Sequence, residues 1–140
     1  MLFPITLTSR LNTRTPDGTF DTIEQTHHGM AALRDNGTWS LRYADADNNG
    51  QTALQGATNW MSISREGDTQ SRMLFRLDEM LEAVYRTPQG EFEMSTRATT
   101  YTAQVDAQGG AVVLHYDLYV SGELVAHNQL LLQWQRREEQ

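Results

Sequence analysis

The sequence contains neither cysteine nor lysine, and each absence excludes a class of chemistry. Without a thiol the chain can form no disulfide, no iron–sulfur cluster, no thiolate zinc site and no cysteine nucleophile. Without a lysine amine it can form no Schiff base with pyridoxal phosphate, and it lacks the phosphate-binding lysine of a P-loop. All eleven basic side chains other than histidine are therefore arginine.

Positive charge and long apolar runs are also scarce. The formal net charge is -7, whereas a nucleic-acid binder needs a basic surface and an anionic membrane attracts one. No apolar run approaches the roughly 20 residues of a membrane span, and the first residues carry no charged leader of the secretory kind. We therefore expect a cytoplasmic protein with no nucleic-acid and no membrane partner.

What the sequence does contain is a series of short segments in which apolar and polar residues alternate. Phe3, Ile5 and Leu7 share one face of the first segment, and Asn36-Gly37 is a strong hairpin signal. Turn signals at short, regular intervals between such segments are typical of an antiparallel sandwich or barrel. No linker divides the chain, so we predict one all-β domain over residues 1–140, with little or no helix.

One segment, residues 77–85, is ambiguous. Leu77, Met80, Leu81 and Val84 have helical spacing, and Asp78 could cap a helix there. The neighbouring strands and the turn at residues 85–90 favour a hairpin instead. We favour the strand and keep the helix as the alternative.

The segment at residues 45–50 is similar to the first half of a calcium-binding loop. It places side-chain oxygens at Asp45, Asp47 and Asn49 and a glycine at position 50, as a hard cation requires. The twelfth position of such a loop is Gly56 rather than a bidentate Glu. A solvated turn is the favoured interpretation, with calcium as the weak alternative.

The histidines offer no better metal site. His27 and His28 are consecutive, so they point to opposite faces of a strand. His115 and His127 lie on neighbouring predicted strands, outside the apolar phase, where an outward cross-strand pair is plausible without further ligands. No G-x-S-x-G motif supports a hydrolytic triad. We expect no metal, no cofactor and no catalytic residue.

The most informative side chain is Arg65. Counting back by two through Ile63 and Met61 places it on the apolar side of its strand, and a buried guanidinium needs a partner. Glu24, in phase with Phe20, is the candidate carboxylate. Further polar residues on otherwise apolar faces could complete an internal cluster: Tyr85, Thr87, Thr96, Tyr116 and Asn128.

This cluster has two interpretations. It is either a structural network that fixes strand register, which we favour, or the polar lining of a ligand pocket. As an alternative to both, Arg65 could lie at the strand end beside Gly67 with its guanidinium in water.

A set of short motifs in the same region points to a known family. They are Asp21-Thr22-Ile23-Glu24, Gly29, Arg65-Glu66-Gly67, Tyr85-Arg86-Thr87-Pro88-Gln89-Gly90, Thr96 and Tyr116-Asp117-Leu118. In this order they resemble the uncharacterised bacterial YwiB-like family over nearly the whole chain. The resemblance implies a calycin-like, lipocalin-like β-barrel and brings no established activity. Gln89 departs from the family, where an aromatic residue is common.

These observations support three functional hypotheses for a barrel of about eight to ten strands. The leading one is a non-enzymatic barrel that binds a small, partly apolar molecule inside, with Arg65 and Glu24 as the polar anchor. The second is a barrel filled by its own side chains that serves as a protein-interaction or regulatory module, which admits a homodimer. The third is a hydrolase or isomerase with Glu24 as base beside Arg65.

Overall fold

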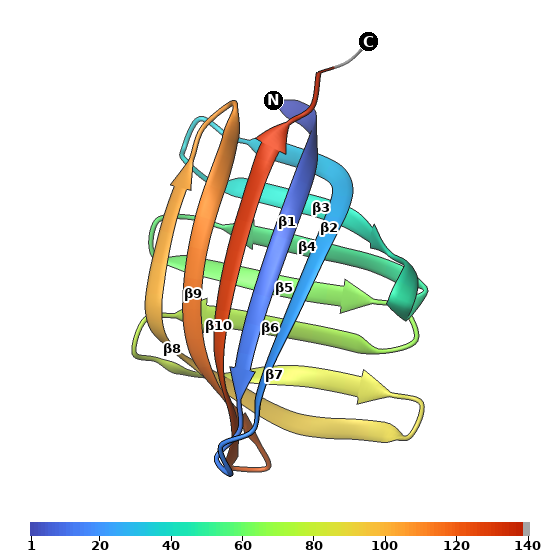
Figure 1. Cartoon of the computed structure of the whole chain (residues 1–140), viewed down its shortest axis with the longest axis vertical. Helices are drawn as coiled ribbons and strands as arrows, with labels where there is room; N and C mark the ends of the chain where they lie inside the picture. Colours follow the sequence, from blue (N-terminus) through green and yellow to red (C-terminus); the bar gives the residue numbers. More distant parts are fainter. Residues whose placement is uncertain (139–140) are drawn as a thin grey trace.

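Antiparallel strands form almost the whole of the computed structural model, which describes residues 1–138. The strands are β1 (Leu2–Arg14), β2 (Phe20–Leu33), β3 (Trp39–Asp45), β4 (Gly50–Gly56), β5 (Trp60–Glu66), β6 (Gln70–Arg76), β7 (Met80–Thr87), β8 (Gly90–Val105), β9 (Gly109–Val120) and β10 (Glu123–Arg136). Each pairs with its neighbours in sequence, and β1 also pairs with β10, so the sheet closes into a barrel (Figure 1). The all-β barrel expected from the alternation and from the family resemblance is confirmed.

Among the described residues 1–138, helix is limited to one 3₁₀ turn, η1 (Ala46–Asn48), between β3 and β4. Within residues 1–138, no helix has the length and apolar character needed to cross a membrane. The ambiguous segment after β6 is a turn followed by β7. The backbone N–H of Asp78 donates to the carbonyl of Ala98 at 2.8 Å, and Asp78 takes a positive φ of 62°. Pairing with β8 thus outweighs the helical spacing, and the helix alternative is wrong.

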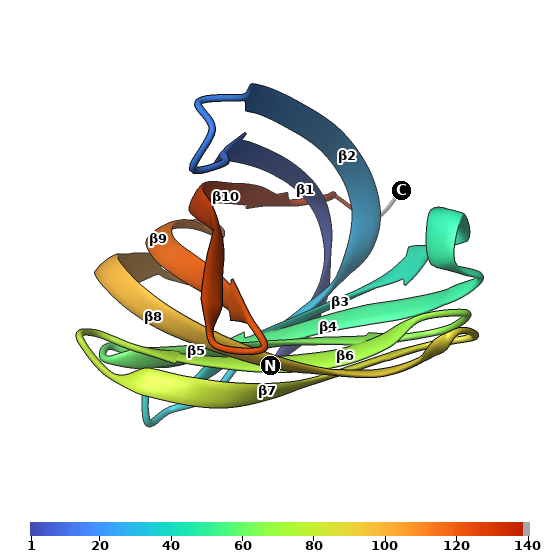
Figure 2. The same cartoon turned by 90° about the horizontal axis from the view of Figure 1, so that it is seen from below.

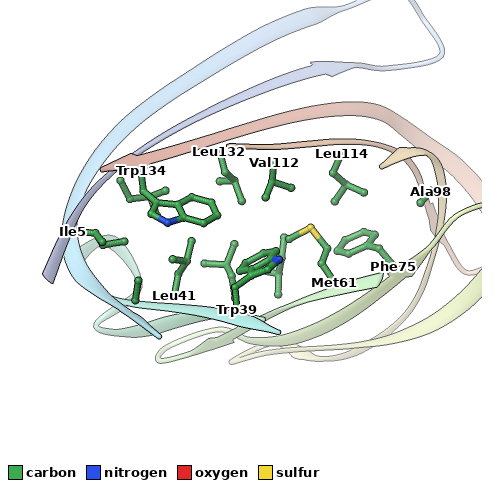
Figure 3. Packing of buried hydrophobic residues seen from close by; sticks show 14 of the residues in the cluster. Ile5, Trp39, Leu41, Met61, Phe75, Ala98, Val112, Leu114, Leu132 and Trp134 are labelled. Atoms are coloured by element: carbon green, nitrogen blue, oxygen red, sulfur yellow. The ribbon is translucent and has the colours of Figure 1, made fainter. Parts of the chain in front are cut away.

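One half of the barrel interior is filled by apolar side chains, and we call it the sealed half. On the β3–β6 wall the strand register aligns two apolar rows: Trp39, Gly56, Met61 and Phe75, then Leu41, Leu54, Ile63 and Met73. Side chains from β1, β9 and β10, including Ile5, Val112, Leu114, Leu132 and Trp134, point at these rows from the opposite wall (Figure 3). The sealed half is therefore a packed core with no room for a ligand.

Two indole rings set the packing of this core. The ring centroids of Trp39 and Trp134 lie 5.5 Å apart. Each ring covers a glycine, because a Cβ added at Gly56 would lie 2.5 Å from Cζ2 of Trp39, and one added at Gly110 would lie 2.3 Å from Cζ2 of Trp134. Only glycine allows the rings to approach the sheet this closely.

The other half of the barrel is open along one side. β2 pairs with β1 along its length but with β3 only from Gly29 to Leu33. Residues 20–28 therefore form a free strand edge, and Figure 2 shows this part of β2 arching away from β3–β7. The gap gives solvent access to the interior, and we call this part of the barrel the open half.

Candidate functional site

A row of polar side chains crosses the interior where the apolar rows end. Strand register places Tyr43, Thr52, Arg65, Ser71 and Tyr85 side by side on β3–β7. Directly opposed residues on antiparallel strands have Cβ atoms about 5 Å apart, so the five side chains form a continuous surface. We call this set the polar row.

Arg65 lies at the centre of the polar row, on the interior side of β5 as its phase predicted. The expectation that it is buried is wrong, because its side chain is exposed to solvent. β5 ends one residue later at Glu66, and the sealed half ends one row earlier at Ile63. The guanidinium forms no ion pair with any carboxylate of residues 1–138. The alternative of a strand-end arginine with its head in water is therefore the one observed, and the buried Arg65–Glu24 anchor on which both interpretations of an internal cluster depended is wrong.

Glu24 is not the partner of Arg65, and this prediction is wrong. The register of β1 with β2 pairs Leu11 with Ile23 and Arg10 with Glu24, so the odd-numbered residues of β2 face inward. Glu24 faces outward, where its Oε1 lies 3.4 Å from Nε of Arg10 and its side chain is 67% exposed. The predicted inward direction of Glu24 depends on Phe20 facing inward, but Phe20 is itself 64% exposed.

The other predicted members of the cluster divide into two groups. Tyr85 belongs to the polar row, and Tyr116 and Asn128 are paired, buried neighbours on β9 and β10. Thr96 and Thr87 have structural hydrogen bonds instead. The hydroxyl of Thr96 donates to the Leu74 carbonyl at 3.1 Å, and that of Thr87 donates to the Gly90 carbonyl at the tip of the β7–β8 turn.

The electrostatics place the Arg65 charge between the two walls of the barrel. Burial raises the pKa of the Tyr116 phenol, while the Asn128 side chain and the Arg65 charge act against that rise. Burial likewise raises the pKa of Tyr43, opposed by Thr52 and by Arg65. The Arg65 charge therefore acts on tyrosines of two different walls, Tyr43 on β3 and Tyr116 on β9.

A cavity of about 290 Å³ opens beside the polar row. Its lining comes from the polar row, from η1 and the β5–β6 turn, and from β2 across the gap: Gln25, Asp45, Asp47, Asn48, Arg65, Thr69, Ser71 and Tyr85. Deeper on the β10 wall, Oδ1 of Asn128 is buried and has no hydrogen-bond partner in the part of the chain that the structure describes. The open half thus offers both charge and an unused acceptor.

A row of apolar side chains crosses the other wall of the barrel. Register aligns Leu114, Leu130, Leu11 and Ile23 across β9, β10, β1 and β2. Leu114 is fully buried, whereas Ile23 at the free edge of β2 is 48% exposed. We call this set the apolar row. It runs from the packed core to the free edge of β2.

The segment at residues 45–50, which resembles half a calcium-binding loop, is joined by hydrogen bonds to the β5–β6 turn. The Asn48 side chain bonds three times to Thr69 of the β5–β6 turn: its Nδ2 donates to the Thr69 carbonyl at 2.8 Å, and its Oδ1 accepts from the backbone N–H and from the hydroxyl of Thr69 at 2.8 and 2.7 Å. Nδ2 of Asn49 adds a 2.6 Å bond to Asp68. We call these bonds the turn clasp.

Glycine allows the two turns to come this close. A Cβ at Gly67 would lie 2.0 Å from the Asn48 carbonyl oxygen. Asp45 accepts a hydrogen bond from the Thr52 hydroxyl at 3.3 Å. No group of three or more histidines and carboxylates within residues 1–138 could hold a metal ion.

The histidines fill roles that spacing alone did not predict. His27 faces inward and stacks on Tyr43, with ring centroids 4.1 Å apart, and its Nε2 lies 3.2 Å from Oε1 of Gln25. Nδ1 of His127 lies 2.5 Å from Oδ1 of Asp117. The predicted pair of His127 with His115 is not formed, because the register of β9 with β10 places Asp117 directly opposite His127.

Sequence reasoning missed Tyr43 and Thr52 of the polar row and four lining residues of the cavity, namely Gln25, Asn48, Thr69 and Ser71. A signal for three of them was present. Tyr43 continues the phase of Trp39 and Leu41, Thr52 that of Leu54, and Ser71 that of Phe75. Gln25 could not be found in this way, because every residue from 20 to 26 is exposed and no apolar face marks the phase of that part of β2.

Comparison with known proteins places the chain among its relatives. A family model described as "Domain of unknown function (DUF1934)" matches residues 5–132. The chain belongs to this family. The crystal structure of the ywiB protein from Bacillus subtilis is similar over 98% of this chain and 94% of that one, with a TM-score of 0.87 and 19% sequence identity.

The DUF1934 family and the YwiB structure confirm the resemblance seen in the motifs, and at this identity the structure shows a shared fold alone. No curated protein matches the chain. Neither comparison assigns an activity.

Proposed function

We propose that the open half of the barrel binds a small, partly apolar molecule without converting it, and that Arg65 contacts an anionic group of that molecule. The observation that carries the proposal is the guanidinium in the polar row, which has no carboxylate partner in residues 1–138 and lines a cavity of about 290 Å³. Pockets of this kind combine apolar walls with a few convergent polar groups. The ring of Tyr85 supplies the apolar part of this lining.

The outward position of Glu24 removes the basis for the enzymatic hypothesis. A hydrolase or isomerase of the kind considered needs the carboxylate beside Arg65, but Glu24 pairs with Arg10 on the other face of the sheet. We therefore propose that the polar row binds a ligand and does not catalyse a reaction. The expectations of a cytoplasmic location and of no cofactor, nucleic-acid or membrane partner remain predictions.

The experiment is a titration with 4-methylpentanoate, a branched carboxylate, followed by ¹⁵N-resolved NMR. We expect shifts at the backbone amides of the polar row, and a loss of affinity of about tenfold or more in Arg65→Gln, since charge-assisted bidentate bonds to a carboxylate are strong. Arg72→Gln is the matched control, because Arg72 is exposed on the next strand and faces outward.

Equal affinity of the two variants would contradict the proposal. Unfolding by urea provides a check on structure. Because Arg65 is exposed and without an ion pair, Arg65→Gln should change the free energy of unfolding by less than about 0.5 kcal/mol.

The free edge of β2 favours a second candidate, a protein-interaction module. Unpaired strand edges are templates for an added strand, and residues 20–28 lack a partner on the β3 side. The same spectra separate the two candidates. Broadening or shifts confined to residues 20–28 as protein concentration rises, with no response of the polar row to the carboxylate, would support the interaction module instead.

A further inference from the structure

We propose that the molecule bound in the open half is zwitterionic, an amino acid with an apolar side chain, whose carboxylate contacts Arg65 and whose ammonium group contacts Asp45 and Asp47. This inference rests on the proposed function and specifies its ligand class. The juxtaposition behind it is one guanidinium and two carboxylates on the lining of the same cavity.

The two carboxylates are free to accept a cationic group. Asp45 is the last residue of β3, in phase with Tyr43, and its side chain accepts a hydrogen bond from the Thr52 hydroxyl at 3.3 Å. Asp47 lies in η1 and is exposed. Neither forms an ion pair with an arginine or histidine within residues 1–138. An ammonium group, with three donors, can bond to both.

A metal ion fits these carboxylates less well than an organic cation. Calcium takes six to eight oxygen ligands, and Oδ1 of Asn48, between the two carboxylates and Asn49 in the sequence, already accepts two hydrogen bonds from Thr69. No third histidine or carboxylate in the described chain completes a metal site. The two carboxylates therefore suit an ammonium group, which has three donors, better than a calcium ion.

The balance of charge selects a zwitterion over a simple anion. The cavity lining carries one positive and two negative side chains, a sum of -1. A monoanion attracted by Arg65 is repelled by Asp45 and Asp47 at the same time, whereas a zwitterion brings no net charge and meets an opposite charge at each end.

Size and surroundings fit the same class. Pockets for drug-sized ligands occupy roughly 300–1,000 Å³, and this cavity of about 290 Å³ is at the low end, suited to a molecule of amino-acid size. The half-buried ring of Tyr85 lies in the lining and offers an apolar face for an aliphatic side chain.

The experiment compares three molecules that share an isobutyl group by calorimetry and ¹⁵N-resolved NMR on the full chain at pH 7. They are L-leucine, 4-methylpentanoate, which lacks the ammonium group, and 3-methylbutylamine, which lacks the carboxylate. We expect L-leucine to bind at least tenfold more tightly than either analogue. Its shifts should map to the polar row and η1.

Variants locate the two charges. In Asp45→Asn/Asp47→Asn the preference for L-leucine over 4-methylpentanoate should fall to less than about twofold, because the ammonium group loses both partners. Asp35→Asn, which removes one negative charge in the exposed β2–β3 turn, should keep the preference. Arg65→Gln should weaken L-leucine and 4-methylpentanoate alike.

The outcomes separate this inference from the proposed function. If 4-methylpentanoate binds at the polar row as tightly as L-leucine, the inference of a zwitterionic ligand is wrong, while the proposal that Arg65 binds an anionic group is supported. If neither carboxylate binds there, both proposals fail. If 3-methylbutylamine binds as tightly as L-leucine and Arg65→Gln has no effect, the site is one for amines and both proposals again fail.

Discussion

The sealed half and the open half of the barrel are built from the same strands, but their interior positions carry different side chains. On β5, Met61 and Ile63 are buried, whereas Arg65, two residues further on the same face, is exposed. On β3, Trp39 and Leu41 are likewise followed by the half-buried Tyr43. The phase of a strand therefore says which way a side chain points, and its position along the strand says whether it is covered.

The largest expected loss of stability comes from a test that removes one aromatic side chain from each half. Trp134→Ala should lower the free energy of unfolding by about 3–5 kcal/mol, because it leaves a cavity beside Trp39 that the packed sealed half cannot close. Phe92→Ala, at an interior position beside Tyr85 that is 44% exposed, should cost about 1 kcal/mol. Urea unfolding followed by circular dichroism measures both, and equal losses would mean that the two halves are packed alike.

A smaller effect is expected at the rim of the open half. Asn48→Ala removes the three bonds of the turn clasp to Thr69, and at about 0.5–1.5 kcal/mol each they should cost about 2–3 kcal/mol. Asn49→Gly removes the exposed bond to Asp68 and suits the positive φ of 51° at that position, so it should be nearly neutral. A near-zero loss for Asn48→Ala in urea unfolding would show that the clasp does not stabilise the rim.

The smallest expected effect is a difference between the two halves in how the free energy of unfolding depends on pH. Burial raises the pKa of Tyr101 to about 12, and its hydroxyl donates to the Ala57 carbonyl at 2.7 Å in the sealed half. Because the folded pKa exceeds the unfolded value near 10, this tyrosine stabilises the fold fully below pH 10, and that contribution is lost as the pH rises toward 12.

Urea unfolding between pH 8 and 11.5 measures this loss in the wild type and in two variants. Tyr101→Phe should lose less stability with rising pH than the wild type. The pH-dependent loss of stability in Tyr43→Phe should differ less from that of the wild type than the loss in Tyr101→Phe does. The reason is that Thr52 and Arg65 oppose the rise of the Tyr43 pKa. The reverse order of the two variants would place the more strongly desolvated tyrosine in the open half.

Much of the fold could be predicted from local patterns. Strict alternation in segments such as Val112, Leu114 and Tyr116 predicts strands with one buried face, and the structure buries all three side chains. The choice of barrel over sandwich depended on the family motifs, because both architectures bury one face of each strand. The interior direction of Arg65 followed from the same phase.

The site was predicted less well because it depends on register between strands. Glu24 was placed on the wrong face because the first half of β2 has no buried residue to set its phase, and an error of one residue reverses every side chain. The turn clasp joins residues 48 and 69, and no pattern within either turn indicates the other. Local alternation carries no information about such contacts.

The one-sided pairing of β2 has a consequence for motion. Residues 20–28 are held by β1 alone, while β1 is held by β10 on its other side from Ile5 to Arg14. β2 leaves β3 at Gly29, where a Cβ would lie 2.4 Å from the Arg42 carbonyl oxygen. Segments with few tertiary contacts open at low free energy. We therefore expect residues 20–28 to open at a lower free energy than residues 29–33, which pair with β3 as well.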